Sequence, residues 1–298
     1  MKDRIDVIIF GSNGQDGRYL KILSEKEGKK VDCISRSGTK IIGDIRNYSF
    51  VEEQIKKKQP RYIFDFAALS TTKHSALFEN HQIICTGTLN ILEAARLHCP
   101  ESKIFISGSA LQFKNDGNPI AEQAAFEGSS PYSVSRIHSV YAARYFRNAF
   151  GLQTYVGYFF HHDSPFRSEQ HINQKIVQAV KRISLGSKEK LELGNIDVKK
   201  EFNYALDIVE AVCVLMNQGK IHEAVLGCGE AHSIKEWLEY CFHKIGKNWE
   251  DYVILKDNFI SEFSILVSNP SLIKSLGWKP KVSFYQLADI MFDSNIEQ

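Results

Sequence analysis

Short apolar runs alternate with amphipathic stretches from the first residues of the chain onward. Val7 to Phe10 is continuously apolar, as is typical of a strand buried on both faces of a parallel sheet. Further strands are predicted over residues 31–35, 62–66, 103–107 and 154–160. Helical spacing predicts helices up to about residue 27 and over residues 50–58, 81–97 and 131–150. Repeated strand–helix units with short links imply a parallel sheet with right-handed crossovers, which is the doubly wound α/β (Rossmann) class.

The pattern changes after about residue 160, where helices and short strands follow one another less regularly and Gly and Pro interrupt them. We therefore expect residues 1–160 to form a dinucleotide-binding domain. Residues 161–298 are expected to form mainly a smaller α/β lobe that binds the substrate. The apolar helix predicted over residues 204–217 is expected to return to the first domain.

Composition narrows the class of protein further. The 298 residues are 43% hydrophobic and 24% charged, and a net charge of +2 offers no basic field for nucleic acid or a membrane surface. The apolar run that follows Arg4 is too short for a signal peptide or a membrane span. The six cysteines are scattered with no CxxC pair, so neither disulfides nor a metal site are expected. A cytoplasmic location is predicted.

A glycine-rich turn lies between the first predicted strand and the first predicted helix. Glycines at positions 11, 14 and 17 permit a tight turn, close approach of the backbone to a pyrophosphate, and close helix–strand packing. The N-terminus of the following helix adds free N–H groups and partial positive charge. The residues predicted to bind a dinucleotide cofactor here are Gly11, Asn13, Gly14, Gln15, Asp16 and Gly17.

The end of the second predicted strand distinguishes between the two nicotinamide cofactors. An acidic residue there would bind the ribose 2′-hydroxyl of NAD, whereas an arginine accommodates the 2′-phosphate of NADP. The sequence reads Ser35-Arg36-Ser37, and Asp32 lies too early, within the strand. Arg36 therefore favours NADP, with NAD as the alternative.

Tyr132 and Arg136 open the long helix predicted over residues 131–150. An i, i+4 pair lies on one helix face, so a phenol and a guanidinium there can point at the same nicotinamide. A nearby cation stabilises tyrosinate and lowers the pKa of a phenol, which makes the phenol a usable acid or base toward a carbinol. Tyr132 and Arg136 are thus the predicted catalytic pair.

Several motifs together resemble the extended short-chain dehydrogenase/reductase family, and most of all its GDP-mannose 4,6-dehydratases. The more specific of them are Gly14-Gln-Asp-Gly17 and Phe160-His-His162-Asp-Ser-Pro165. The others are Gly43-Asp44, Ala67-Ala68, Gly87-Thr88, Ser130-Pro-Tyr132, Leu193-Gly-Asn195, Asn269-Pro270 and Leu276-Gly-Trp-Lys-Pro280. The resemblance covers nearly the whole chain.

The resemblance implies further site residues. It places Asp44 at the adenine, Ala67 and Ala68 along the pyrophosphate and ribose, and Ile45 and His162 at the cofactor. It also implies a nucleotide-activated sugar as substrate, with a GDP-sugar favoured. The candidate substrate-binding residues that it implies are His161, Lys175, Asn195 and Lys200.

The chain departs from the family at its chemical centre. Arg136 stands where the family has lysine, and arginine is larger and planar. The family's Ser/Thr at the sugar C4 oxygen falls at Gly108, flanked by Ser107 and Ser109, which makes Ser109 the third catalytic candidate. The dehydratase glutamate falls at Ala110. Four more departures are Gln112 and Phe113 for a Tyr-Gly pair, His161 for asparagine, and Phe259 for a nucleotide-binding arginine.

The leading hypothesis is an NADP-dependent nucleotide-sugar oxidoreductase that reduces or oxidises C4 of a GDP-linked sugar. One alternative is a GDP-mannose 4,6-dehydratase or an epimerase that uses substitute acid/base residues, such as His161 or Asp163. Another is a non-catalytic, cofactor-binding regulator on the same fold, because function depends on the site and not on the fold. A homodimer or homotetramer is expected.

Overall fold

A single parallel sheet forms the centre of the molecule in the computed structural model, which describes residues 5–256 and 261–294. Seven strands lie in the order β11-β6-β5-β4-β1-β2-β3, and each neighbouring pair is parallel. The strands are β1 (Val7–Phe10), β2 (Val31–Ser35), β3 (Ile41–Ile42), β4 (Tyr62–Asp65), β5 (Lys103–Ser109), β6 (Gln153–Phe159) and β11 (Glu223–Leu226). The predicted doubly wound α/β class is confirmed.

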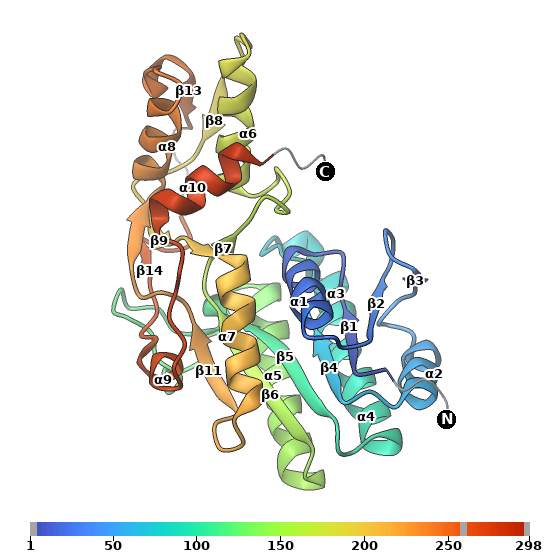
Figure 1. Cartoon of the computed structure of the whole chain (residues 1–298). Helices are drawn as coiled ribbons and strands as arrows, with labels where there is room; N and C mark the ends of the chain where they lie inside the picture. The colour runs from blue at the N-terminus through green and yellow to red at the C-terminus, as the bar shows by residue number, and fades with distance from the viewer. Residues whose placement is uncertain (1–4, 257–260, 295–298) are drawn as a thin grey trace.

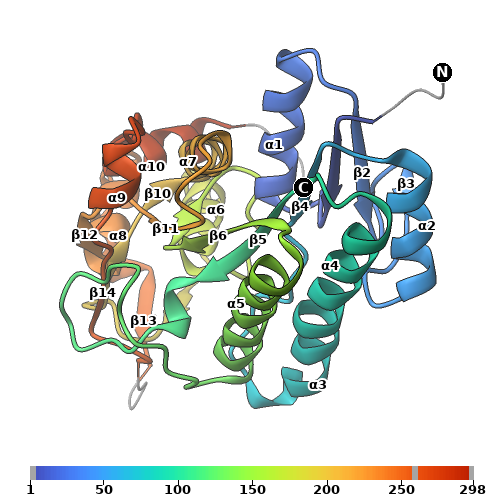
Figure 2. The ribbon, with the colours of Figure 1, turned by 90° about the horizontal axis from the view of Figure 1, so that it is seen from below.

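Helices cover both faces of this sheet (Figure 2). On one face, α1 (Gln15–Lys26), α7 (Ala205–Asn217) and α9 (Ser271–Ser275) share an apolar cluster with the strands. On the other, α2 (Tyr48–Lys58), α4 (Gly87–His98) and α5 (Pro131–Phe150) form a second cluster. Both faces of the central strands are therefore buried, which explains their continuously apolar sequence. Within the described residues, no helix is both long enough and apolar enough to cross a membrane.

The helix predicted over residues 81–97 is divided in the structure. A short 3₁₀ turn, η1 (His74–Ala76), and α3 (Leu77–Asn80) lead into a π-helical segment, η2 (His81–Thr86), and only then into α4. Hydrophobic spacing does not register this change because the π segment continues the same helical path with one more residue per hydrogen-bonded turn. Ile83 of the π segment lies against the smaller of two cavities described below.

The remaining elements form a smaller lobe at the carboxyl edge of the sheet (Figure 1). A third apolar cluster joins α6 (Ile172–Ser184), α8 (Ile234–His243) and α10 (Phe284–Asp293). The short strands of the lobe are β7 (His162–Asp163) with β10 (Asn203–Tyr204), β8 (Leu191–Leu193) with β13 (Val253–Leu255), and β9 (Lys199–Glu201) with β12 (Ala231–Ser233) and β14 (Ile265–Leu266). The 3₁₀ turns η3 (Ala110–Gln112) and η4 (Trp249–Asp251) complete the described elements. Because β11 and α7 pack with the sheet, the two parts alternate along the sequence.

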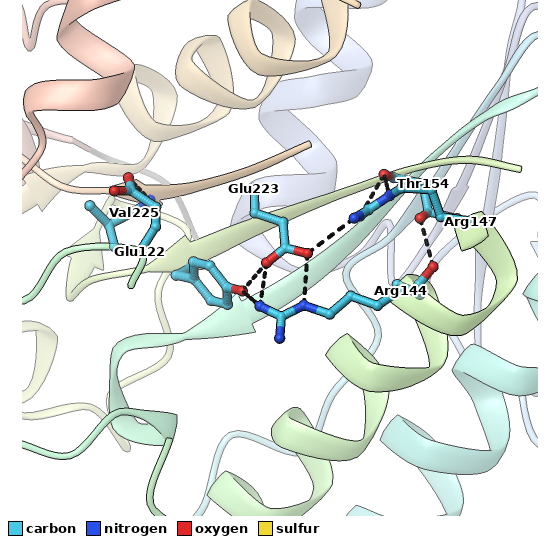
Figure 3. Close-up of polar contacts among 8 residues, drawn as sticks. Glu122, Arg144, Arg147, Thr154, Glu223 and Val225 are labelled. Carbon is cyan, nitrogen blue, oxygen red and sulfur yellow. Dashed lines mark hydrogen bonds and ion pairs between the residues drawn. The ribbon is translucent and has the colours of Figure 1, made fainter. Parts of the chain in front are cut away.

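A charged network fastens α5 to the edge of the sheet (Figure 3). The Glu223 carboxylate on β11 accepts hydrogen bonds from Arg144 Nη2 at 2.6 Å and Arg147 Nη1 at 3.2 Å. It also accepts one from the Tyr158 hydroxyl on β6 at 2.5 Å. Glu122, in the loop before α5, accepts a hydrogen bond from the Val225 backbone at 2.9 Å. These contacts fix the helix that carries Tyr132 and Arg136.

Candidate functional site

Two cavities lie where the parallel strands end at their carboxyl edge. The larger has a volume of about 440 Å³ and extends between the sheet and the smaller lobe. The smaller, of about 180 Å³, lies over β2 and β3. Gly14, Phe66 and Ala68 line both cavities, which therefore adjoin. This edge of an open α/β sheet is where ligands bind in this class of fold.

The glycine turn forms the wall between the cavities, and its conformation explains the residue type. Gly11 has φ of +77°, and a Cβ there would lie 2.6 Å from the Ala67 nitrogen. A Cβ on Gly17 would lie 2.5 Å from the Ser12 Cα. The first glycine thus permits the turn against β4, and the third lets α1 pack closely on the turn. This cradle fits the pyrophosphate of a dinucleotide, to which the N-terminus of α1 adds its N–H groups.

Predicted cofactor residues converge on the smaller cavity. Gly11, Arg36, Asp44, Ile45 and Ala67 line it. Asn13 does not line either cavity, since its side chain accepts a hydrogen bond from Arg18 Nη2 at 2.9 Å and packs beside Gly38.

The predicted catalytic pair lies at the base of the larger cavity. The N-cap Ser130 and Pro131 start α5, so Tyr132 is in its first turn and Arg136 one turn later. Tyr132 is 8% exposed and Arg136 is 5% exposed. Arg136 Nε donates to the Tyr132 hydroxyl oxygen at 3.2 Å, and Arg136 Nη1 donates to the Ser107 carbonyl oxygen at 2.5 Å. The guanidinium thus holds the phenol oxygen in position by a hydrogen bond.

A buried carboxyl group lies near this guanidinium. Asp65, at the end of β4, accepts hydrogen bonds from Thr88 Oγ1 and the Ala67 backbone, each at 3.1 Å. Burial raises the pKa of Asp65 to about 6, against the opposing influence of the Arg136 charge. Asp65 lines neither cavity. Its hydrogen bonds hold the end of β4 in place, and it is not positioned to contact a substrate.

The alternation of side chains along β5 determines which of its residues line the larger cavity. Ser107 and Ser109 line the larger cavity, and Gly108 does not. A Cβ on Gly108 would lie 2.7 Å from Tyr158 Cδ1, on the other face of the sheet. Ser107 Oγ donates to the Asp65 carbonyl oxygen at 2.8 Å, whereas Ser109 Oγ accepts from the Leu111 nitrogen at 3.2 Å and can still donate its proton into the cavity. Gly108 leaves room for the Tyr158 ring. Ala110 and Leu111 follow as apolar lining residues.

Two residues of the glycine turn contact the loop after β6. Asp16 Oδ1 lies 3.0 Å from His162 Nε2, while Gln15 Nε2 donates to the His162 carbonyl oxygen at 3.1 Å. Burial lowers the pKa of His162, but the adjacent Asp16 carboxylate outweighs it and the net shift is upward. Gln15 Oε1 also accepts from Ser164 Oγ at 2.9 Å. Asp16 is the only carboxylate among the described residues that line the larger cavity, and it is engaged by His162.

Basic side chains surround the far wall of the larger cavity. His161, Arg167 and His171 line it, and buried Lys200 lies nearby. Burial and the charges of Lys200 and Arg167 hold the pKa of His161 well below its usual value, so the imidazole is neutral at pH 7. Burial likewise lowers the pKa of Lys200 to about 8. Burial lowers the pKa of His171 to about 4, so this imidazole is also neutral at pH 7. The positive charge that suits an anionic ligand such as a diphosphate comes from Lys200 and from Arg167, which lies 3.7 Å from Asp163.

Not every predicted substrate residue reaches a cavity. Lys175 Nζ donates to the Glu192 carbonyl oxygen at 2.9 Å, and Asn195 Oδ1 accepts from the Asp197 backbone at 2.9 Å. Both side chains lie outside the two cavities. Phe259, at the position of the family's arginine, lies outside the described residues.

The structure also adds lining residues that the sequence reading missed. These are Ser70, Thr71, Thr72, Lys73, Leu111, Phe159, Arg167 and His171. Residues 70–73 form a polar run just after β4. Polar residues that follow a parallel strand lie at the ligand-binding edge, so this run could have been identified from the sequence. Among the residues that the structure describes, no cluster of three His, Cys, Asp or Glu side chains could hold a metal ion.

The sheet order, the glycine turn and the Tyr132–Arg136 helix define an extended short-chain dehydrogenase/reductase. The family model that matches is GDP-mannose 4,6 dehydratase, over residues 8–291. The chain belongs to this family, as the sequence resemblance predicted. "GDP-mannose 4,6 dehydratase 1" of Arabidopsis thaliana is 30% identical over 329 residues, which cover 100% of this chain and 91% of the relative.

Solved structures support the same fold. The UDP-glucose 4-epimerase of Thermus thermophilus, in complex with NAD, matches with a TM-score of 0.84 at 18% identity, over 98% of this chain and 100% of that one. RMD from Pseudomonas aeruginosa, complexed with NADPH, matches with a TM-score of 0.85 at 18% identity, over 96% and 97% of the two chains. Family and fold together confirm the predicted class, that of NAD(P)-dependent sugar-nucleotide enzymes.

Proposed function

We propose that this protein is an NADP-dependent oxidoreductase acting at C4 of a GDP-linked sugar, as a 4-keto reductase or dehydrogenase. One observation carries the proposal. The larger cavity combines a phenol supported by a guanidinium with a serine hydroxyl, and the one carboxylate in its described lining is already paired with His162. Such a site has the groups for oxidation or reduction of a carbinol, and its described lining offers no free carboxylate to remove a C5 proton.

The residues divide the chemistry as follows. A bound nicotinamide supplies the hydride to C4 in reduction, or accepts it in oxidation. Tyr132 donates a proton to the C4 oxygen in reduction and accepts one in oxidation, so atoms and charge balance in both directions. Arg136, within hydrogen-bond distance of the phenol oxygen, stabilises the tyrosinate that proton donation leaves. Ser109, whose side chain lines the same cavity, is assigned the hydrogen bond to the C4 oxygen.

The substrate class rests on charge and on family. The positive charges of Arg167 and nearby Lys200 support a diphosphate-linked substrate, and the family favours GDP as the nucleotide. Arg36 at the rim of the smaller cavity supports NADP over NAD. A cytoplasmic location and a homodimeric or homotetrameric state stay predictions.

A second candidate function is the 4,6-dehydration catalysed by the family's named members. It would need a substitute base, and the observation in its favour is His161. This imidazole lines the cavity, is neutral at pH 7, and has a buried Nδ1 with no hydrogen-bond partner among the described residues. Asp163 is a poorer candidate because its Oδ2 accepts from Asn173 Nδ2 at 2.6 Å and it does not line the cavity.

The test compares two substrates. With NADPH and the 4-keto-6-deoxy derivative of GDP-mannose, we expect the absorbance of the reduced cofactor to fall as the ketone is reduced. With GDP-mannose and NADP, we expect no loss of water from the sugar. Turnover of neither substrate, nor of any other sugar nucleotide, by a protein that binds cofactor would instead identify a non-catalytic regulator.

A further inference from the structure

Arg36, the residue that favours NADP, is engaged by a carboxylate from a distant part of the chain. Its Nη1 lies 3.4 Å from Oε1 of Glu79 on α3. The two side chains are 55% and 45% exposed, so the pair lies at the open rim of the smaller cavity. A carboxylate thus occupies a donor of the guanidinium that the proposed function assigns to a phosphate.

A second charged pair lies beside the first. Arg46 donates from Nε to both carboxylate oxygens of Asp44 at 2.9 Å. These hydrogen bonds are the main cause that lowers the pKa of Asp44. The charge of Arg36 lowers it further. Asp44 lines the smaller cavity as Arg36 does. Two arginines are therefore matched by two carboxylates, and the cluster formed by these four side chains is electrically neutral before any cofactor arrives.

A 2′-phosphate would meet this neutral cluster, not a free cation. At pH 7 it carries a charge between −1 and −2, and it must draw the Arg36 guanidinium away from Glu79 or bind next to a like charge. Either route costs free energy. A ribose 2′-hydroxyl has no charge and carries no such cost. Glu79 therefore acts selectively against the phosphorylated cofactor.

We propose that Glu79 is a specificity-determining residue of the cofactor site, which competes with the 2′-phosphate for Arg36 and so limits the preference for NADPH. The inference rests on the proposed function for the assignment of Arg36 to the 2′-phosphate. Sequence position gave no indication of it, because Glu79 is 43 residues from Arg36 along the chain. In dinucleotide sites of this fold the selective acid ordinarily stands at the end of the second strand, and here α3 supplies it.

The experiment measures dissociation constants of NADPH and NADH for the full chain and for Glu79→Gln, without any sugar substrate. We expect Glu79→Gln to bind NADPH about threefold to fivefold more tightly, the range set by an exposed ion pair. NADH affinity should change by less than twofold, and the NADPH effect should shrink with added salt. The matched control is Glu239→Gln, which removes an equally exposed carboxylate paired with Lys235 on α8. It should alter neither affinity.

A double variant separates competition from simple repulsion. In an Arg36→Ala background, Glu79→Gln should lose most of its effect on NADPH binding, because there is no guanidinium left to release. Unchanged or weaker NADPH binding by Glu79→Gln would overturn the inference, as would an equal gain for NADH. If the unaltered protein binds both cofactors equally while Glu79→Gln prefers NADPH, the inference stands and the proposed NADP preference fails. Binding of neither cofactor by any variant would overturn both.

Discussion

Arg136 donates a hydrogen bond from Nε to the hydroxyl oxygen of Tyr132 across 3.2 Å, within the first two turns of α5. The same guanidinium donates from Nη1 to both the carbonyl and the hydroxyl oxygen of Ser107. The rigid fork of arginine therefore links the phenol to β5 in one unit, which the single ammonium of a lysine cannot do in the same geometry. Under the proposed function, we expect catalysis at this site to depend on how well that unit stabilises a tyrosinate.

The first prediction concerns the phenol itself. Tyr132→Phe should lower turnover by about 10²–10⁴-fold, because the hydroxyl transfers the proton at C4. Binding of NADPH should stay within a few-fold, since the ring and the Arg136–Ser107 contacts remain. Steady-state kinetics and a cofactor titration check the two halves separately. Retention of most activity would mean that another group transfers the proton.

The second prediction concerns the cation. Arg136→Lys should preserve or raise kcat if Arg136 performs the task that lysine has in the family. Arg136→Met keeps the bulk but removes the charge, and it should lower kcat, because the tyrosinate left by proton donation then lacks the adjacent cation. Activity retained by the lysine variant and lost by the methionine variant distinguishes this effect from damage to the fold. Equal activity of the lysine and methionine variants would exclude an electrostatic role.

The third prediction concerns cofactor choice. Arg36→Ala should lose the preference for NADPH over NADH. A charge-assisted hydrogen bond contributes about 1.5–3 kcal/mol, so the ratio of the two dissociation constants should shift by about tenfold or more. Equal affinity for both cofactors in the unaltered protein would contradict the proposed preference for NADP.

The fourth prediction concerns stability. Glu223→Gln leaves Arg144 and Arg147 without their counter-ion, and urea denaturation should show a loss of about 2–3 kcal/mol. This is less than the roughly 3–5 kcal/mol of a fully buried pair, because the Arg144 side chain is 32% exposed. Glu239→Gln should change stability by less than about 0.5 kcal/mol.

The same variant predicts a pH dependence. Burial raises the pKa of Glu223, but hydrogen bonds from Arg144 and Tyr158 outweigh it, so the folded pKa lies below the ordinary value. The stabilisation is therefore complete above the unfolded pKa of a glutamate and is lost as the pH falls through the folded one. The stability difference between the unaltered protein and Glu223→Gln should be full at pH 7 and shrink in acid. A constant difference across that range would contradict the ionic role.

The sequence predicted those parts of the molecule that local pattern determines. The strands over Val7–Phe10 and Val31–Ser35 and the helix over Pro131–Phe150 have the predicted bounds. The bounds of these elements can be predicted because Gly, Ser and Pro interrupt the apolar runs within a few residues of where each element ends. The glycine turn and the Tyr132–Arg136 pair were equally local, and the structure brings both to the ligand-binding edge of the sheet.

Contacts between distant segments could not be predicted in this way. Nothing near Gly108 in the sequence indicates that the Tyr158 ring occupies the space where a side chain would lie. The engagement of Arg36 by Glu79 depends on where α3 lies in the fold, because the two residues are 43 positions apart along the chain. Lys175 has the residue type and the family position expected of a substrate-binding residue. Its ammonium nevertheless donates to the Glu192 carbonyl oxygen and does not reach either cavity.

The last prediction is that this protein does not convert GDP-mannose to its 4-keto-6-deoxy derivative at a useful rate. After oxidation at C4, dehydration needs a base beside C5, and the residues after β5 that line the cavity are Ala110 and Leu111. Loss of a general base costs about 10²–10⁴ in rate. Mass spectrometry of GDP-mannose incubated with protein and NADP should show no loss of water. Rapid loss of water that His161→Asn abolishes would establish the dehydratase instead.

Installing a base requires care, because Gly108→Thr would collide with Tyr158 and Ala110→Glu would place a carboxylate at a position only 2% exposed within the apolar core. Leu111→Glu avoids both problems, and Leu111→Gln is its uncharged control. Water loss that appears with the glutamate and not with the glutamine would show that the remaining site still suits dehydration and lacks only the base.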